Sequence, residues 1–420
     1  MDTSSQKYTL LTGSKVIDGN GGRPIEDGVI LMEDDEIKAV GQKGSISIPE
    51  GADINEIDYQ GMTILPGLID CHVHLIGIGD GRSGDELSQV PDEVLTLQAA
   101  QNAEAHLFSG VTTVRDLGAK NRTTFMLRLG QQMGIANTPR LILSGRPIAI
   151  VAGHLSYFGT TATGTVEGRE AVRQLLGEGA DFIKITATGG STKTSVPGRP
   201  SFNVDEITAI ADEAHKFGVH VAAHCTNSQG ILNALEGGVD TIIHGYHLEA
   251  DGALTYRREI GERMAKNGIF LNPTLQQGRE RIWQLLAKRN TTELTTMENK
   301  EVVDFEKSWA ERLPFFKNLL NDGVKLVAGT DASWMHYKLG GTSLQDEILA
   351  HVDIGLSPME AIVSATRDSA RSCWIDHYVG TLEPGKKADI LVVDGDPSTD
   401  IKALRNIQDI YVSGNRVIRK

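Results

Sequence analysis

Two histidines stand two residues apart in the segment 66–75, Pro-Gly-Leu-Ile-Asp-Cys-His-Val-His-Leu. The apolar residues that lead into His72 and His74 predict a β-strand, and side chains at positions i and i+2 of a strand point to the same side. Both imidazoles can therefore face one point at the end of the strand. Two neutral imidazoles that converge in this way are typical ligands of a zinc-type cation.

Further side chains that can bind a metal or move a proton follow other apolar, strand-like segments. These are Lys184, His224, His244 and Asp331. Taken singly, the two histidines fit satisfied core residues, the aspartate fits a helix cap, and the lysine fits half of a buried ion pair. A charged amine inside an apolar strand is costly to bury, however. The repeated position of these groups at strand ends favours one shared metal site.

The elements that must position these groups alternate along the chain from residue 66 onwards. Apolar β-branched runs are followed by amphipathic helical stretches, most clearly at 204–217. The strand candidates are 68–74, 111–116, 140–144, 181–187, 219–224, 240–244, 268–273 and 325–330. Eight such units predict an α/β fold of the (β/α)8 TIM-barrel type, which places its chemistry at the carboxyl ends of the strands. The segment 276–320 is too long for one connecting helix and predicts an extra helix or a lid.

Both ends of the chain read as short strands separated by turns. We expect them to pair into a small β-sandwich domain beside the barrel. The predicted organisation is therefore 1–65 for the N-terminal part of the sandwich, 66–375 for the barrel and 376–420 for the C-terminal part of the sandwich.

Composition narrows the class of protein. The 420 residues carry a net charge of −14, which argues against nucleic acid or an anionic membrane as partner. Three cysteines give no disulfide framework and fit a reducing compartment. We find no signal-peptide pattern and no apolar run close to the about 20 residues of a membrane span. We therefore expect a cytoplasmic protein.

The motifs resemble the amidohydrolase superfamily, in the branch near imidazolonepropionases and metal-dependent Xaa-Pro dipeptidases. The resemblance covers nearly the whole chain. It rests on the segments 66–74, 179–184, 223–224, 244–245, 329–331 and 380–389.

The resemblance implies two divalent metal ions, with zinc expected and manganese, iron or cobalt as alternatives. It implies six metal ligands: His72, His74, Lys184, His224, His244 and Asp331. The first two histidines and the aspartate would hold one metal, and the other two histidines would hold the second. Lys184, carbamylated by CO2, would bridge both, which explains a lysine in a buried strand.

The implied reaction is hydrolysis of a C–N amide bond of the dipeptide or N-acyl amino acid type. A hydroxide that bridges the metals would attack the carbonyl, with Asp331 as general acid and base. His154, on a glycine-flanked loop after the third strand, is expected to bind the oxyanion. The alternatives are the same machinery on an aryl amide, urea, carbamate, mycotoxin-type amide, lactam or lactone, then a mononuclear deaminase, then a non-catalytic scaffold.

Candidate contacts to a small-molecule substrate are Tyr246, Arg199 and Trp334, with His336 and Tyr337 as further pocket residues. Thr226 stands where the related dipeptidases often carry a tyrosine, which puts a dipeptide substrate in question. Histidines on helical patterns are expected to be exposed or to cap helices; they are His106, His215 and His351. Relatives commonly self-associate, so a homo-oligomer is expected.

Overall fold

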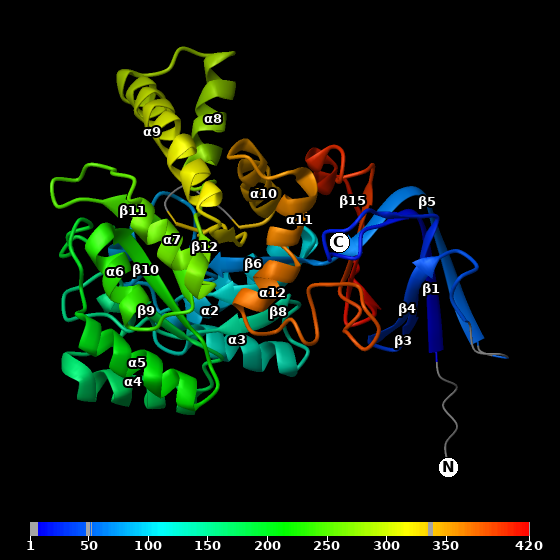
Figure 1. Cartoon of the computed structure of the whole chain (residues 1–420), viewed down its shortest axis with the longest axis horizontal. Helices are drawn as coiled ribbons and strands as arrows, with labels where there is room; N and C mark the ends of the chain where they lie inside the picture. The colour runs from blue at the N-terminus through cyan, green and yellow to red at the C-terminus, as the bar shows by residue number, and fades with distance from the viewer. Residues whose placement is uncertain (1–6, 48–50, 52, 335–338, 420) are drawn as a thin grey trace.

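The structure, a computed structural model, describes residues 7–47, 51, 53–334 and 339–419. One part alternates strands and helices, and a sheet built from both ends of the chain lies beside it (Figure 1). Two of the predicted pocket residues, His336 and Tyr337, lie outside the described residues. Within the described ranges, no helix has both the length and the apolar character that crossing a membrane requires.

All eight strands expected for the barrel are present. They are β6 (Leu68–Val73), β7 (Val111–Asp116), β8 (Arg140–Leu143), β9 (Ile183–Thr186), β10 (Val221–Asn227), β11 (Thr241–Leu248), β12 (Phe270–Asn272) and β13 (Lys325–Leu326). Every pairing between neighbours is parallel. β6, β7 and β9 are buried along their whole length, as parallel strands covered on both faces must be.

The predicted barrel is not closed by continuous ladders within the described residues. The strands form a three-stranded sheet, β6-β7-β8, and a five-stranded sheet, β9 to β13. At one seam the carboxylate of Asp181 takes the N–H of Leu143 that a neighbouring strand would otherwise bind. The other gap lies between β13 and β6. There the backbone carbonyls of residues 364–365 accept the N–H groups of Ala328 and Ile69.

Side chains nevertheless meet inside the ring of strands. Ile69, Ile142, Phe182, Ala222 and Ile243, which lie on or next to five of the strands, belong to one buried cluster. The interior is therefore a packed core, as in a TIM-type barrel, although backbone pairing is interrupted at two places.

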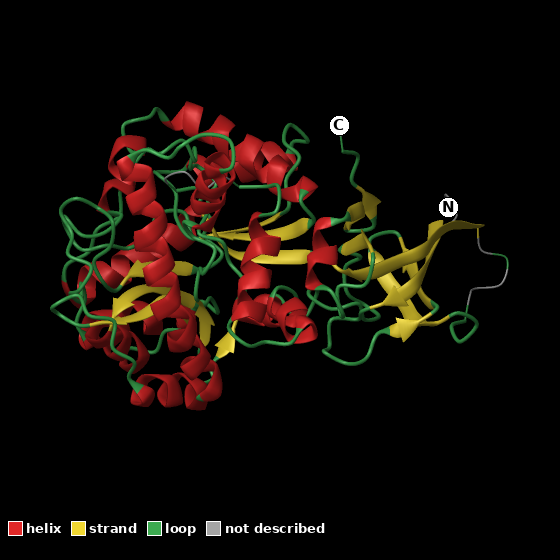
Figure 2. Ribbon diagram, turned by 90° about the horizontal axis from the view of Figure 1, so that it is seen from above, coloured by secondary structure: helices red, strands yellow, loops and turns green. Residues whose placement is uncertain are grey.

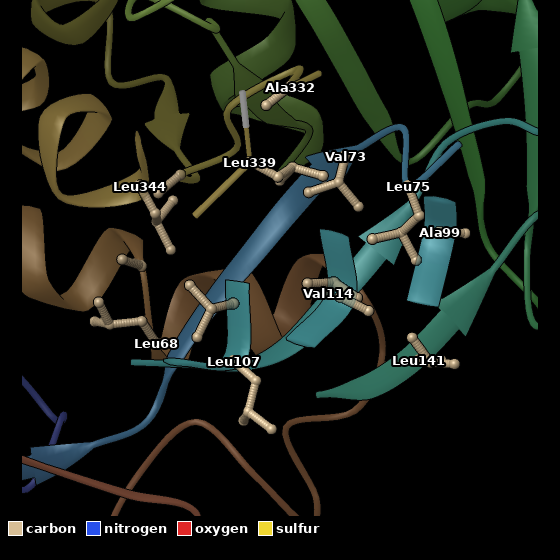
Figure 3. Packing of buried hydrophobic residues seen from close by; sticks show 14 of the residues in the cluster. Leu68, Val73, Leu75, Ala99, Leu107, Val114, Leu141, Ala332, Leu339 and Leu344 are labelled. Atoms are coloured by element: carbon tan, nitrogen blue, oxygen red, sulfur yellow. The ribbon is translucent and has the colours of Figure 1, made fainter. Parts of the chain in front are cut away.

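A separate cluster packs the outside of β6 against its neighbours. Figure 3 shows Leu68 and Val73 of β6 with Val114 of β7, Leu107 and Leu344, the last two from helices. Because tightly packed side chains resist displacement, this cluster fixes the strand that carries His72.

The helices that surround the strands are α1 (Gly84–Leu87), α2 (Asp92–Phe108), α3 (Thr123–Gln132), α4 (Gly164–Glu178), α5 (Val204–Lys216), α6 (Ser228–Glu236), α7 (Arg258–Asn267), α10 (Ser343–Asp353), α11 (Pro358–Ser364) and α12 (Arg367–Ser372). Figure 2 shows them packed around the barrel strands, whereas the part with both chain ends is mostly strand. The predicted start of α5 is confirmed, because Asn203 and Glu206 form a capping box there.

The segment expected to add a helix or lid forms two helices, α8 (Arg279–Arg289) and α9 (Thr296–Asn321). They project from the rest of the molecule as a pair (Figure 1). Ile282, Leu285, Leu294 and Val302 give the pair a small core of its own. Phe316, in the last turns of α9, joins the buried cluster between strands β9 to β13 and the helices outside them, so the pair is anchored at its base.

Both chain ends pair within one sheet, whose strands are β1 (Lys7–Val16), β2 (Ile25–Glu26), β3 (Gly28–Glu33), β4 (Glu36–Gln42), β5 (Asp53–Pro66), β14 (Ile390–Asp394), β15 (Ile407–Val412) and β16 (Asn415–Arg416). Its order is β16-β15-β14-β5-β1-β3-β4, with β2 beside β1. The antiparallel pairing of β5 with β14 joins the two ends of the chain.

A separate β-sandwich is not confirmed. In β14, Ile390 and Val392 point into the core of the terminal sheet, while Leu391 and Val393 join the barrel cluster. Successive side chains of a strand face opposite sides, so this strand packs against the barrel on one face. The barrel therefore supplies the second layer here, and the domain boundaries stay a prediction.

Candidate metal centre

Three predicted metal ligands converge at the end of β6. The Nε2 atoms of His72 and His74 lie 3.3 Å apart. The Oδ1 atom of Asp331 lies 3.2 Å from the first and 3.4 Å from the second. All three side chains are buried, and their ligand atoms lie within 4.8 Å of one another. β6 brings the two histidines to this point, and the chain that follows β13 brings the aspartate.

In each histidine, the hydrogen bond of Nδ1 determines the tautomer and leaves Nε2 to face the other ligands. His72 donates from Nδ1 to the side-chain oxygen of Asn272 at 3.0 Å, and His74 donates from Nδ1 to the carbonyl of Gly118 at 2.8 Å. A neutral imidazole with its proton on Nδ1 carries a lone pair on Nε2. Both lone pairs therefore point toward the carboxylate oxygen.

His224 and His244 lie beside this group. Their ring centroids are 4.7 Å apart, and the rings of His72 and His244 are 5.6 Å apart. His224 donates from Nε2 to the carbonyl of Gly189 at 3.2 Å, which leaves the lone pair on its Nδ1. His244 bonds through Nδ1 to the hydroxyl of Thr274 at 2.8 Å, which leaves its Nε2 for the centre.

Lys184 is 1% exposed and lies in β9, where its backbone pairs with Ala222 of β10. Burial lowers the pKa of Lys184 to about 7, with the charge of Arg115 adding to this effect and that of Asp331 opposing it. A large share of the amine is therefore neutral at neutral pH, which is the form that reacts with CO2.

Burial also keeps the histidines neutral. It lowers the pKa of His72 to about 4 and that of His154 to about 3, and it lowers the pKa of both His224 and His244 well below the usual value. Neutral imidazoles are the form that binds metal. Burial raises the pKa of Asp331, whereas the charge that His72 and His244 carry when protonated, with hydrogen bonds from His72 and His74, lowers it well below the usual range. The carboxylate is therefore ionised.

The donor set fits a divalent cation. Two imidazole lone pairs and one carboxylate oxygen face one another at 3.2–3.4 Å, and the hydrogen bonds above place no proton between them. Such a group of acceptors repels itself unless a positive charge lies at its centre. Nitrogen and oxygen ligands of this kind suit zinc and equally suit manganese, iron or cobalt.

Asp331 is held from two directions. Gln277 donates from Nε2 to its Oδ2 at 2.9 Å, and the backbone N–H of Asp331 donates to the carbonyl of His72 at 2.7 Å. Its neighbour Thr330 donates to the buried carboxylate of Asp70, which also accepts the N–H of His72. Asp70 therefore links the segment that carries His72 to the segment that carries Asp331.

His154 lies next to the histidine cluster. Its ring centroid is 4.4 Å from that of His224, and the side chain is 6% exposed. Its Nδ1 is bonded to the hydroxyl of Thr192 at 3.1 Å, a residue of the glycine-rich loop after β9. The loop after β9 thus contacts the residue that is predicted to bind the oxyanion.

The predicted substrate contacts divide into two groups. Tyr246 stacks parallel to His244 at 6.4 Å, and Trp334 lies 4.7 Å from the ring of His74. Arg199, in contrast, is exposed on the loop between β9 and α5.

Two expectations about helical histidines are wrong. His106 and His351 are fully buried, because each has a buried polar partner, Asp70 for the first and Ser364 for the second. His215 follows the expectation, since its side chain is 37% exposed.

Sequence reasoning missed two residues that orient the histidines. These are Asn272, on β12, and Thr274, just after it. Gln277, which holds the aspartate, is a residue that the sequence already indicates for the pocket wall after the seventh strand. A polar asparagine that ends a strand between apolar neighbours is a usable signal, because a buried amide needs partners.

We expect Asn272→Ala to weaken metal binding by about 10–100-fold, because loss of an outer hydrogen-bond partner frees the ring of the ligand histidine. A chelator competition assay measures this affinity. Asn233→Ala, which removes an amide from α6 that bonds to the carbonyl of Phe202, is the matched control and should change nothing. Unchanged affinity in Asn272→Ala would show that the orientation of His72 does not depend on this bond.

Fold and site together define a barrel-type protein with a histidine-rich cluster that could hold a metal ion. The chain belongs to the amidohydrolase family, whose model matches residues 63–417. The predicted resemblance is therefore confirmed, and the protein is a hydrolase of a family that acts on C–N bonds.

Individual relatives are distant but align along nearly the whole chain. The ochratoxinase of Aspergillus niger is 24% identical over 440 residues, covering 96% of this chain and 84% of the relative. The imidazolonepropionase of Rhizorhabdus wittichii is 26% identical over 412 residues, covering 90% of each. A solved Xaa-Pro dipeptidase with bound methionine in its active site has a TM-score of 0.80 and 28% identity, covering 98% of this chain and 99% of that one.

Proposed function

We propose that this protein hydrolyses the C–N bond of a linear amide, such as a dipeptide or an N-acyl amino acid, at a centre of two divalent metal ions. The observation that carries the proposal is the convergence of His72, His74 and Asp331 on one point, with His224 and His244 beside it. The similarity to a Xaa-Pro dipeptidase at a TM-score of 0.80 supports the same substrate class.

The residues that would hold the metals are His72, His74 and Asp331 for one ion and His224 and His244 for the other, with carbamylated Lys184 between them. When bound, such ions lower the pKa of a coordinated water to about 7 and polarise the amide carbonyl.

Asp331 is the proposed general base and acid. It is ionised, 4% exposed, and its Oδ2 is fixed by the amide of Gln277. A fixed carboxylate of this kind accepts the proton of the attacking water and then donates it to the leaving nitrogen. The surrounding burial excludes bulk water that would otherwise exchange this proton.

His154 is the proposed partner of the carbonyl oxygen. When the hydroxyl of Thr192 donates to Nδ1, the neutral ring carries its proton on Nε2 and can donate it to a developing oxyanion. The low pKa that burial gives His154 does not impair this role, because a neutral imidazole is still a donor.

We expect His154→Ala to lower kcat by about 10²–10³-fold while metal content stays unchanged, the usual cost of one oxyanion donor. Thr192→Val, which removes the group that fixes the tautomer, should give a smaller loss in the same direction. Steady-state kinetics on an amide substrate measure both. An unchanged kcat in His154→Ala would remove His154 from the reaction.

A second candidate is the same centre acting on an aryl amide, urea, carbamate, lactam or lactone. The observation behind it is Thr226, whose hydroxyl is already bonded to Thr188 and to the carbonyls of Gly189 and Pro197. This hydroxyl is therefore occupied at the position where related dipeptidases often carry a tyrosine.

The test is a mass-spectrometric screen of enzyme loaded with zinc and bicarbonate. The mixture contains Xaa-Pro and other dipeptides, N-acyl amino acids, aryl amides, ureas, lactams and lactones. Release of free amino acids supports the linear amide. Ring-opened or aryl-amine products with intact peptides support the second candidate, and no product at all contradicts both.

A further inference from the structure

Arg312, in α9, is a buried cation that forms no ion pair within the described residues. Its side chain is 9% exposed. Nη2 reaches two backbone carbonyls, those of Thr274 at 3.5 Å and Leu275 at 3.4 Å, and the buried Nε has no hydrogen-bond partner. A buried guanidinium outside an ion pair is costly. The buried carboxylate of Glu347 lies at the same loop, but its oxygens accept the N–H groups of Leu275 and Gln276. The Nε donor of Arg312 therefore stays open to a further anion.

Aromatic rings lie against the faces of this guanidinium. They do not cover its edge, where the N–H donors are. Its carbon lies 5.4 Å from the ring centroid of Tyr246 and 5.6 Å from that of Trp309. Cation–π contacts stabilise the charge and hold the plane of the group. They do not use the N–H donors, which lie in that plane and form the fork that binds a carboxylate edge-on.

Short contacts connect Arg312 to the metal centre. Tyr246 stacks on His244, and Thr274, whose carbonyl meets Arg312, binds His244 through its hydroxyl. Three residues further along, Gln277 holds Asp331. Arg312 is therefore connected to one predicted ligand, His244, through two neighbours, Tyr246 and Thr274.

A second group in the same loop also lacks partners. Gln276 is fully buried, and neither its Oε1 nor its Nε2 forms a hydrogen bond. Buried amides are nearly always bonded. An unpaired amide and an unpaired guanidinium Nε, both on or against residues 274–277, indicate that a polar ligand completes this region.

We propose that Arg312, framed by Tyr246, binds the carboxylate of the substrate, so that the enzyme prefers amides whose leaving amine is an α-amino acid. The proposal rests on the proposed function and names the residue that recognises the carboxylate of its substrates. It assigns to Arg312 the role that the sequence predicted for Arg199, which lies exposed.

The kinetic test compares N-acetyl-L-phenylalanine with N-phenethylacetamide, which differs by the missing carboxylate. Arg312→Met keeps an apolar stem between the rings and removes the charge. It should lower kcat/KM for the acid by about 100-fold, mainly through KM, and leave the amide without a carboxylate unchanged. Arg289→Met, which removes an exposed arginine of α8, is the matched control and should change neither substrate.

A binding measurement separates this proposal from the proposed function. Calorimetric titration of the metal-loaded enzyme with L-phenylalanine and with phenethylamine needs no turnover. Loss of affinity for the amino acid alone in Arg312→Met supports the carboxylate site even if no amide is hydrolysed. Equal affinity of wild type and variant for L-phenylalanine, or no binding to either, overturns it.

A purely structural role for Arg312 predicts a different pattern, namely equal losses for both substrates. Arg312→Lys keeps the charge without the planar fork and is the variant to use if Arg312→Met does not fold. A loss of about 10-fold restricted to the acid supports the proposal, and equal losses for acid and amide reject it.

Discussion

An Asp331→Asn enzyme is expected to lose turnover by about 10³-fold while it keeps its metal, because the exchange removes proton transfer and leaves an oxygen ligand in place. The side-chain oxygen can still face His72 and His74, which now lie 3.2 and 3.4 Å from it. Gln277, the donor to Oδ2, can rotate its amide and accept from the new NH2 group.

Metal content by inductively coupled plasma mass spectrometry and kcat on the same preparation give the two readings. Gln277→Met is the companion variant. It should lose less turnover than Asp331→Asn, because Gln277 only orients the carboxylate. If Asp331→Asn keeps more than a tenth of the turnover, another group moves the proton. If it loses the metal together with the activity, Asp331 acts mainly as a ligand.

The sequence predicted the position of every barrel strand, since buried parallel strands are continuous apolar runs bounded by turns. It did not predict where backbone pairing stops. The N–H of Leu143 is taken by the side chain of Asp181, and the N–H of Ala328 by the carbonyl of Ser364. Both partners are set by tertiary packing, and the hydrophobic pattern of a strand contains no information about them.

At the candidate metal centre, too, local patterns were predictable and contacts between distant residues were not. His72 and His74 were predictable because the period of a strand fixes their common side, but the group that aims His72 lies 200 residues away, at Asn272. Arg312 was missed for a related reason. It lies in the helical insertion, where an arginine is ordinarily solvated, and its significance follows from the rings and carbonyls that enclose it.

The helical pattern of the sequence did not predict that His106 and His351 are buried. His106 occupies an inward position of α2, and its hydrogen bond to Asp70 at 2.9 Å makes that burial tolerable. Asp70 in turn accepts the N–H of Thr330 and the N–H of His72. A residue expected on the surface therefore belongs to the network that supports the predicted ligands.

Lys184→Met is expected to lower the metal content from two ions per chain to one. The side chain is buried in β9 beside the histidine cluster, and methionine fills similar space without a group that CO2 can modify. Because removing a group that only orients a metal ligand already costs about 10–100-fold in metal affinity or activity, loss of the proposed bridging ligand should cost at least as much turnover. Lys325→Met, an exposed lysine in β13, is the matched control and should keep both metals.

The modification itself is observable by labelling. The neutral amine of Lys184 attacks the carbon of CO2, an N–C bond forms, and one proton is released, which leaves an anionic carbamate. Enzyme equilibrated with ¹³CO2 should show one carbamate carbon signal by NMR that is absent in Lys184→Met. Full metal loading without that signal would mean that the second metal does not need a carbamate.

The pKa of Lys184 gives this labelling a pH dependence. Burial lowers that pKa to about 7, so that the neutral amine is the minor form at pH 6 and the major form at pH 8. Since only the neutral amine attacks CO2, the initial labelling rate of metal-free enzyme at a fixed concentration of dissolved ¹³CO2 should rise about 10-fold between these values. An ordinary solvent-exposed lysine, with its pKa near 10.4, would rise about 100-fold over the same interval and remain far slower throughout. The slope and the absolute rate together therefore test whether burial has prepared Lys184 for carbamylation.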